Sequence, residues 1–404
     1  MPELSTRGQR LVDAPPMPGY ISEHFTRLNA GASGYVGLCI AENKLQSAAL
    51  NEQLAGYAVP ASALGYDAMT GNAVFRERLA RYMGRTFLGR DFLTEQIVLL
   101  AGAGSVLEML FYVLCDSGDG VLVPTPSYAG FWPDLETRDE LNIVPVHCAS
   151  ATDFRLTPEL LDHALEHAAY PVTAMLFTTP NNPLGRVYSR AEILEVAEWA
   201  ARRDIHLVVD EIYALSVFGS REFVSVASVL PELGDKVHVV WGFSKDFGAS
   251  GLRAGVMVSE NRHVLDAAGA LAYWAACSGH TQHLLSSLIT DDAAVDAHID
   301  ATRRGLAQAY GRVTEVLDAF GIPYIAAEAA FFLICDLRRW LQAPTFAAEQ
   351  ALWRRMLDEA NVNLTPGEAC RISEPGFFRL CYAGEDTGLV TDAIKRLGMA
   401  LARA

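Results

Sequence analysis

The feature that most constrains the fold of this chain is an alternation of short apolar segments with helical patterns between residues 95 and 260. The apolar segments are rich in β-branched residues: QIVLLAG, GVLVPTP, AMLFTTP, HLVVDEIY, HVVWGFS and GVMVS. Strands that alternate with helices build a largely parallel sheet that is covered by helices. A capping box at Ser189 and Glu192 predicts the start of one of these helices. The sequence therefore predicts an α/β fold.

The pattern changes after this region. A helical stretch from about 293 to 320 has no strong breaker apart from Gly305 and Gly311, and a helix of that length often bridges two lobes. Strands and helices then mix in FFLICDL, AEQALWRRMLDEAN, FFRLCYA and a terminal helix. We expect three parts: residues 1–50 as an N-terminal arm and part of the small domain, 51–292 as a large domain, and 293–404 as a small α+β domain with the bridging helix. A cleft between the lobes is the default place for a ligand.

Composition excludes several classes of function. The 404 residues are 51% hydrophobic and 20% charged, which suits a soluble chain with a large core. A net charge of −16 without any basic run argues against nucleic acid or an anionic membrane as a partner. The longest apolar runs, such as residues 106–115, are shorter than the roughly 20 residues that span a bilayer. Because MPELSTRGQRLVDAPP lacks a signal pattern, we expect a cytoplasmic location.

Cysteine and histidine usage predicts no metal site. The seven cysteines are scattered and never form C-x-x-C, which is typical of core residues in a reducing compartment. His163 and His167 are spaced i, i+4, but without a third ligand such a pair is more typical of a solvated helix face.

A possible anion site follows the first of these strands. In AGAGSVLEM, residues 101–109, small residues lead from a strand into a helix, so the backbone N–H groups of Ala103, Gly104 and Ser105 can hold a phosphate. A simple tight turn would have the same appearance.

Lys245 and Asp210 are ionisable residues at strand ends, where open α/β sheets bind their ligands. Asp210 ends the apolar strand in VVDEIY, and a buried carboxylate there requires a cationic partner. Lys245 closes another apolar strand and is costly to bury unless it pairs or reacts. A primary amine forms an imine with an aldehyde, and the aldehyde cofactor that also requires a phosphate cradle and a carboxylate opposite a ring nitrogen is pyridoxal 5'-phosphate. We therefore predict Lys245 as the catalytic residue and Asp210 as the partner of the pyridine nitrogen.

Further residues complete this cofactor site. Asn182, which precedes a proline in PNNPLG, and Tyr213 would hydrogen-bond the ring hydroxyl, although Asn182 alone would suit a simple turn. Tyr128 would lie against the ring face. Ser244 and Arg253 would hold the phosphate, for which the planar arginine fork is well suited.

The predicted cofactor-binding residues occur in a characteristic order along the chain: Tyr128, Asn182, Asp210, Tyr213, Ser244, Lys245 and Arg253. In this order they resemble the pattern of the fold-type I pyridoxal phosphate enzymes, the aspartate aminotransferase superfamily. Within it the chain is most similar to 1-aminocyclopropane-1-carboxylate (ACC) synthases, in GLCIAENKL, PVHCASATDF, DEIYALSVFGSREFVSV, SKDFGASGLRAG, TQHLLSSLITD and EPGFFRLCYA. The resemblance covers nearly the whole chain after about residue 20. It implies a large cofactor-binding domain with a mostly parallel sheet between helices, a smaller α+β domain, and a homodimer with shared active sites.

The resemblance also implies a reaction. ACC synthases remove the α-proton of S-adenosylmethionine and displace methylthioadenosine from its γ-carbon. By resemblance, Arg379 grips the substrate α-carboxylate and Lys245 takes the α-proton. Glu42, in AENK, matches a glutamate near the substrate, where a carboxylate can accompany a sulfonium cation. The alternative for Glu42 is a solvated helix start.

Two positions depart from the family pattern. Gly242 stands where the family has a serine that donates to the phosphate. Met69, in LGYDAMTG, is a substrate-binding position where the family has a tyrosine that reaches into the neighbouring site, and Tyr66 could substitute only with a rearranged backbone. We hypothesise that methylthioadenosine still departs but that ring closure is not assured. The vinylglycine-type quinonoid could instead be captured at Cγ by a second substrate, for example an electrophilic pyridinium.

Two other functions stay open. An aminotransferase would convert an amino acid and keto acid pair without releasing methylthioadenosine. A non-catalytic sensor domain that binds pyridoxal phosphate normally carries a DNA-binding module, and no basic helix-turn-helix segment precedes residue 20.

Overall fold

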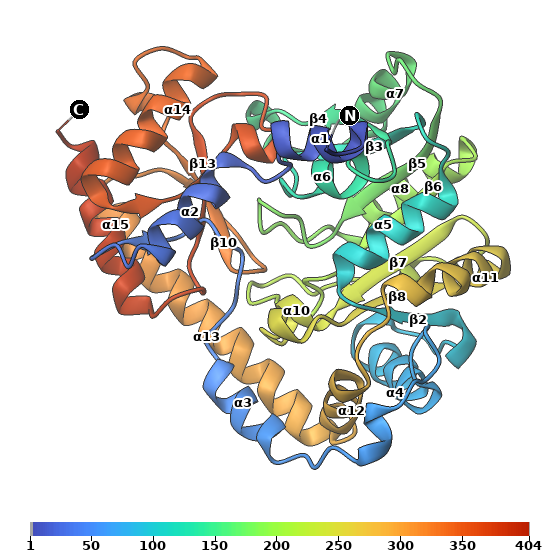
Figure 1. Ribbon diagram of the computed structural model, residues 1–404. Helices are drawn as coiled ribbons and strands as arrows, with labels where there is room; N and C mark the ends of the chain where they lie inside the picture. Colours follow the sequence, from blue (N-terminus) through green and yellow to red (C-terminus); the bar gives the residue numbers. More distant parts are fainter. Residues whose placement is uncertain (1–2, 404) are drawn as a thin grey trace.

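The computed structural model describes residues 3–403, which form two lobes connected by a long helix (Figure 1). The larger lobe contains a seven-stranded sheet in the order β2-β8-β7-β6-β5-β3-β4. Its strands are β2 (Ile97–Leu100), β3 (Gly120–Thr125), β4 (Asn142–His147), β5 (Val172–Thr178), β6 (His206–Asp210), β7 (Val237–Gly242) and β8 (Gly255–Ser259). Only β8 runs antiparallel to its neighbours in this sheet. The predicted α/β fold with a largely parallel sheet is confirmed.

Strand β4 was not among the predicted strands. It is an edge strand, its residues are mostly half-buried, and it contains Pro145. A proline inside a short apolar run weakens the strand signal, and an edge strand tolerates one because its outer N–H groups have no strand partner.

Different helices cover the two faces of the large sheet. The helices of this lobe are α4 (Ala73–Met83), α5 (Ala103–Leu114), α6 (Phe131–Glu136), α7 (Pro158–Glu166), α8 (Arg190–Arg202), α9 (Val226–Val229), α10 (Phe243–Asp246), α11 (Arg262–Leu271) and α12 (Gly279–Leu288). Helices α5, α6 and α11 pack on the face that includes Val240, and α4, α8 and α12 pack on the face of Val239 and Trp241. Because alternate strand residues point to opposite faces, both faces are apolar.

The smaller lobe is built on an antiparallel sheet in the order β12-β13-β10-β9. Its elements are β9 (Tyr324–Ile325), β10 (Phe332–Asp336), β12 (Thr365–Pro366), β13 (Phe377–Cys381), α14 (Phe346–Arg355) and α15 (Thr387–Leu401). The connecting helix is α13 (Asp292–Ala319), which confirms the long helix expected there.

The N-terminal part of the chain contacts both lobes. Its elements α2 (Gly19–Asn29) and β1 (Val36–Gly37) pack with the smaller lobe. Helix α1 (Thr6–Asp13) lies beside the larger lobe, where Arg7 and Arg10 pair with Glu140, and α3 (Ser47–Ala55) contacts α12 (Figure 1). Strand β1 pairs with β11 (Val362–Asn363), which is more than 300 residues away in sequence. The domain boundaries at residues 50 and 292 stay a prediction.

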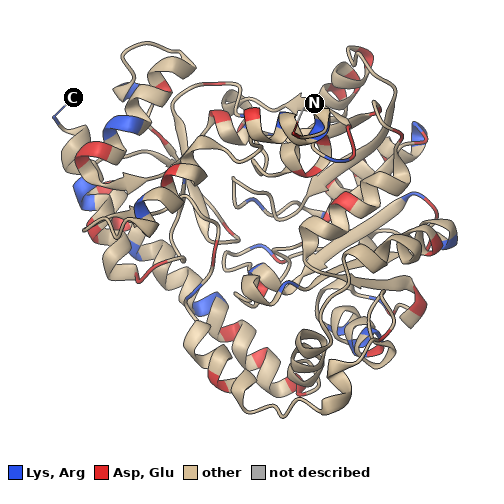
Figure 2. Ribbon diagram, in the orientation of Figure 1, with Lys and Arg blue, Asp and Glu red and all other residues tan. Residues whose placement is uncertain are grey.

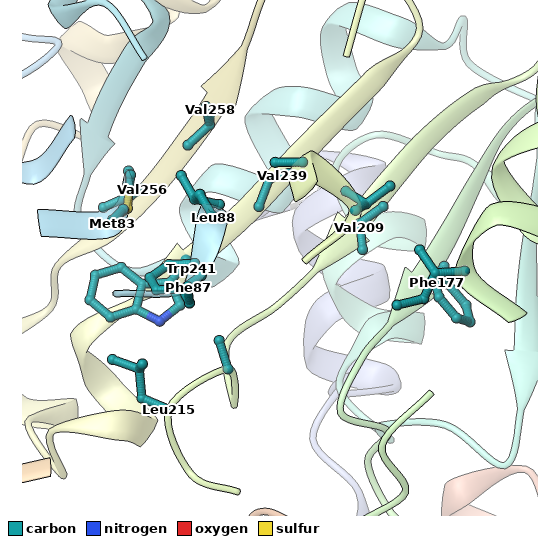
Figure 3. Packing of buried hydrophobic residues seen from close by; sticks show 14 of the residues in the cluster. Met83, Phe87, Leu88, Phe177, Val209, Leu215, Val239, Trp241, Val256 and Val258 are labelled. Atoms are coloured by element: carbon teal, nitrogen blue, oxygen red, sulfur yellow. The ribbon is translucent and has the colours of Figure 1, made fainter. Parts of the chain in front are cut away.

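Trp241, at the end of β7, anchors the turn that carries Lys245. Its indole ring centroid lies 5.4 Å from that of Phe87 and 4.9 Å from that of Phe243. Figure 3 shows Trp241 beside Phe87, with Leu215 nearby. These contacts bury a large apolar area, and aromatic rings favour tilted arrangements such as these.

Charged residues of both signs are distributed over the two lobes (Figure 2). Within residues 3–403, no helix combines the length and apolar character needed to cross a membrane.

The close approach of β8 to the start of α5 generates a prediction. A Cβ atom at Gly255 would overlap backbone atoms of Gly102 and Ala103. Gly255→Ala should therefore lower the free energy of unfolding by about 1–3 kcal/mol, measured by urea denaturation, because the two backbones must separate. Gly311→Ala is the matched control, because a Cβ there meets nothing within 4 Å and alanine favours the helix interior. Equal stability of the two variants would contradict the prediction.

Candidate active site

A cavity of about 270 Å³ opens where β5, β6 and β7 end. This is near the lower end of the roughly 300–1,000 Å³ that is typical of small-molecule sites. Every predicted cofactor-binding residue except Ser105 lines it: Ala103, Gly104, Tyr128, Asn182, Asp210, Tyr213, Ser244, Lys245 and Arg253. Ser105 instead donates its hydroxyl to the carbonyl of Ala101 at 3.3 Å.

One end of this cavity is suited to an anion. In the described chain, the N–H groups of Ala103, Gly104 and Ser105 at the start of α5 have no backbone acceptor. The Arg253 guanidinium occupies the space that a Cβ of Gly102 would fill, and Gly102 has a φ of 101° that favours glycine. A glycine here therefore lets the guanidinium approach the helix start. A phosphate fits a cation beside free N–H groups.

The wall of the cavity also carries a buried acid. Asp210 is the last residue of β6 and is 5% exposed, and its Oδ1 accepts a hydrogen bond from the N–H of Ile212 at 3.2 Å. Burial raises the pKa of Asp210 to about 7, while the charge of Lys245 lowers it. A cationic ring nitrogen brought into the cavity would favour the ionised carboxylate. The donor set of the cavity thus fits pyridoxal phosphate at both ends.

Lys245 lies in α10, directly after β7. Its Nζ donates a hydrogen bond to the carbonyl of Ala41 at 2.7 Å. Burial and the neighbouring Arg379 lower the pKa of Lys245 to about 8. The neutral amine, which is the nucleophile and the base, is consequently accessible near neutral pH.

Asn182 connects the cavity to Arg379. Its Nδ2 donates to the Tyr213 hydroxyl at 3.3 Å, and its Oδ1 accepts from Nη1 of Arg379 at 3.0 Å. Arg379, on β13, is 1% exposed and does not line the cavity, and its Nε has no hydrogen-bond partner among the described residues. A buried guanidinium with a free donor is suited to bind a carboxylate.

The other two predicted substrate residues lie outside the cavity lining. Glu42 forms an ion pair with Lys44 at 3.3 Å, and its charge raises the pKa of Lys245. Met69 is half-buried and packs against the apolar cluster that contains Val98 and Leu100, and Tyr66 is 99% exposed.

Gly242 has a structural explanation. A Cβ at this position would lie 2.8 Å from the carbonyl oxygen of Ala254, which directly precedes β8. A serine would require β7 and β8 to separate locally, so this chain cannot add the family's hydroxyl without a backbone shift.

Sequence reasoning missed several lining residues, among them Thr178, Ser250 and Asp134. Thr178 ends β5 as Asp210 ends β6, which was a usable signal. No sequence signal pointed to Asp134, because only the packing of α6 turns this residue toward the cavity. Burial and the charge of Glu108 raise the pKa of Asp134 to about 7.

The fold and this cavity define a pyridoxal phosphate enzyme with the α/β architecture of aminotransferases. Aspartate aminotransferase from Thermus thermophilus, as a double mutant, has the same fold, with a TM-score of 0.83 at 23% identity over 99% of this chain and 100% of that one. The aromatic aminotransferase from Pyrococcus horikoshii OT3 gives 0.80 at 21% identity, over 94% and 98% of the two chains.

Sequence comparison gives the family. The profile of the family described as Aminotransferase class I and II matches residues 34–397, and the chain belongs to this family. Rice (Oryza sativa subsp. japonica) 1-aminocyclopropane-1-carboxylate synthase 4 is 38% identical over 353 residues, covering 81% of this chain and 71% of the relative. Synthase 6 from Arabidopsis thaliana is 38% identical over 331 residues, covering 80% and 67%. The predicted fold type, cofactor and family resemblance are confirmed.

The lowered pKa of Lys245 predicts how cofactor attachment depends on pH. Only the neutral amine attacks an aldehyde, so the rate at which cofactor-free protein bonds pyridoxal phosphate should rise about tenfold per pH unit up to about pH 8 and then level off. Stopped-flow absorbance of the protein-bound cofactor measures this rate. Lys245→Ala should show no such band, and Lys395→Ala, at an exposed lysine, should follow the wild type. A midpoint near pH 10 would contradict the assignment.

Proposed function

We propose that the protein acts on S-adenosylmethionine, removing its α-proton and releasing methylthioadenosine from the γ-carbon. The observation that carries the proposal is the contact of Arg379 with Asn182, because it sets a buried carboxylate-binding group beside the Lys245 cavity. The relatives named ACC synthases support the same substrate.

Pyridoxal phosphate supplies an electron sink for the α-carbanion when it is bound. In our proposal, Arg253, Ser244 and the start of α5 bind its phosphate, and Asp210 holds the positive charge of its ring nitrogen. Tyr128, which lines the cavity, would lie against the ring.

The remaining chemistry falls to three residues. Arg379 binds the α-carboxylate and thereby orients the Cα–H bond. Lys245 Nζ then takes the α-proton, a role for which a pKa of about 8 is suited. Glu42 compensates the sulfonium charge, which is lost when the C–S bond breaks and its electron pair leaves with sulfur.

The fate of the γ-carbon is the open part of this proposal. Closure onto Cα gives ACC, and capture by a second substrate gives a γ-substituted or annulated amino acid. Gly242 and Met69, where the family pattern changes, are the reason to consider capture. An aminotransferase remains the second candidate, because the matching family and the solved neighbours are aminotransferases.

We also propose a homodimer with shared active sites, formed along the β2 edge. Segment 69–71 and segment 272–276 both border this strand: Leu99 N–H bonds to Thr70, and Leu100 pairs with Ala276. Tyr66, Tyr273 and Trp274, on or next to these segments, are 99%, 67% and 75% exposed. Such large exposed aromatic residues are typical of a protein interface.

Incubation with S-adenosylmethionine tests the reaction. We expect one methylthioadenosine per substrate consumed, and mass spectrometry of the amino-acid product distinguishes ACC from a substituted product. Arg379→Lys should lower kcat/KM about a hundredfold, because a single ammonium cannot hold the carboxylate as the planar fork does. Arg338→Lys, at an exposed arginine in the same lobe, should have little effect. Amine formation from a keto acid without methylthioadenosine would favour the aminotransferase, and clean ACC would eliminate capture.

Light scattering tests the assembly. The proposal predicts a solution mass twice the 43.9 kDa of one chain. Trp274→Glu should shift the protein toward the monomer, because an exposed aromatic at the interface becomes a buried charge there. A stable wild-type monomer would refute shared sites.

A further inference from the structure

A second cavity lies on the other side of the segment that follows β6. Tyr213 still lines the Lys245 cavity, whereas the next two residues, Ala214 and Leu215, line this second cavity of about 700 Å³. We call it the Arg303 pocket. The rest of its lining comes from residues 85–89, residues 217–228, the start of α8 and the middle of α13. Its volume is typical of a site for a small molecule.

The charge of the Arg303 pocket is opposite to that of the chain. Its charged lining residues are four arginines and one glutamate: Arg85, Arg190, Arg221, Arg303 and Glu222. The whole chain has 48 acidic and 32 basic residues, so an average lining would be acidic. A cavity with an excess of one sign of charge attracts ligands of the opposite sign. The Arg303 pocket is therefore suited to an anion.

Two of the four arginines have no acidic partner. Carboxylate oxygens lie 2.9 Å from a guanidinium nitrogen of Arg85 and 3.4 Å from one of Arg221. Within residues 3–403, Arg190 and Arg303 form no ion pair. The charges of these two side chains are therefore free to compensate an anionic ligand.

The guanidinium of Arg303 is held at one nitrogen only. Its Nε donates a hydrogen bond to the carbonyl of Leu215 at 2.9 Å, and its Nη atoms form no hydrogen bond with the described residues. Arg303 is half-buried and lines the pocket. Two parallel N–H donors on a planar group match two oxygens of a phosphate.

The remaining lining suits the organic part of a phosphorylated molecule. The rings of Phe87 and Phe223 form an apolar wall, with their centroids 6.3 Å apart. In the described part of the chain, the N–H groups of residues 220–224 have no backbone acceptor. Such N–H groups can donate to phosphate oxygens together with the arginines.

Arg303 also connects this pocket to Lys245. Leu215, whose carbonyl accepts the bond from Arg303, donates its N–H to Oδ2 of Asp246 at 3.1 Å, and Asp246 directly follows Lys245. Burial raises the pKa of Asp246 to about 6, while the charge of Arg303 lowers it. An anion bound to Arg303 would offset this charge and weaken the ionised carboxylate that holds the lysine turn.

We propose that the Arg303 pocket is an effector site for a phosphorylated small molecule. Arg190 and Arg303 bind its phosphate oxygens, and the bound ligand acts on Lys245 through Leu215 and Asp246. The two sites bias the same buried network, so the coupling between them is reciprocal. This inference does not depend on which substrate the Lys245 cavity takes.

Calorimetry with inorganic pyrophosphate tests the site. The cofactor-loaded protein is used in phosphate-free buffer, so that pyridoxal phosphate occupies the anion-binding end of the Lys245 cavity. Wild type should bind pyrophosphate saturably, and Arg190→Gln and Arg303→Gln should each weaken binding about tenfold, because each removes charge-assisted hydrogen bonds. Arg304→Gln is the matched control, because Arg304 is the next residue of α13, is exposed and does not line the pocket. Its affinity should equal that of wild type.

The absorbance band of the protein-bound cofactor tests the coupling. Pyrophosphate should change this band with the same midpoint as in calorimetry, and Arg190→Gln should move both midpoints together. Arg190 takes no part in the Asp246 network, so this variant decides the matter even where Arg303→Gln disturbs the fold. Circular dichroism of each variant verifies that it is folded.

The site and its coupling can fail separately. If wild type does not bind pyrophosphate, or Arg304→Gln weakens binding as much as the pocket variants do, the site is wrong. If pyrophosphate binds through Arg190 and Arg303 but leaves the cofactor band unchanged, the effector role is wrong.

Discussion

The carboxylate of Asp246 is the interaction on which the geometry of the cavity depends. It is fully buried and accepts hydrogen bonds from the Ser216 hydroxyl at 2.6 Å, the Trp241 indole at 2.9 Å and the Leu215 N–H at 3.1 Å. Since Asp246 directly follows Lys245, these bonds hold the lysine turn against the end of β7 and against the segment after Asp210. A buried acid with several donors is costly to disturb, so the position of Lys245 is tightly determined.

The same network reaches the smaller lobe. The carbonyl of Leu215 accepts a hydrogen bond from Nε of Arg303 on α13 at 2.9 Å, and the carbonyl of Ser216 accepts one from the N–H of Ala330 at 2.9 Å. A third bond joins the two lobes, because Nη1 of Arg379 donates to Oδ1 of Asn182 at 3.0 Å. The groups that would bind cofactor and substrate thus belong to both lobes, and the reacting cavity lies where the lobes meet.

Electrostatics within the cavity follow from burial. Lys245 and Asp210 both have pKa values shifted toward neutrality, to about 8 and about 7, because water is excluded around them. Burial favours the neutral amine of Lys245 and the neutral acid of Asp210. A ligand with a cationic ring nitrogen beside Asp210 would favour the ionised form of this carboxyl group, because opposite charges attract.

The sequence by itself determined the α/β class, the long helix α13 and nine of the fifteen residues that line the Lys245 cavity, because strand periodicity, strand ends and residue chemistry are local properties. It could not show that Ser105 turns away from the cavity, that Met69 packs against an apolar cluster, or that Asp134 faces Asp210's cavity. Only the tertiary structure decided these points, and it also decided that Asn182 meets Arg379 across 197 residues. The physical reason is that such contacts depend on how helices such as α6 rotate and how the two lobes pack, which no local pattern encodes.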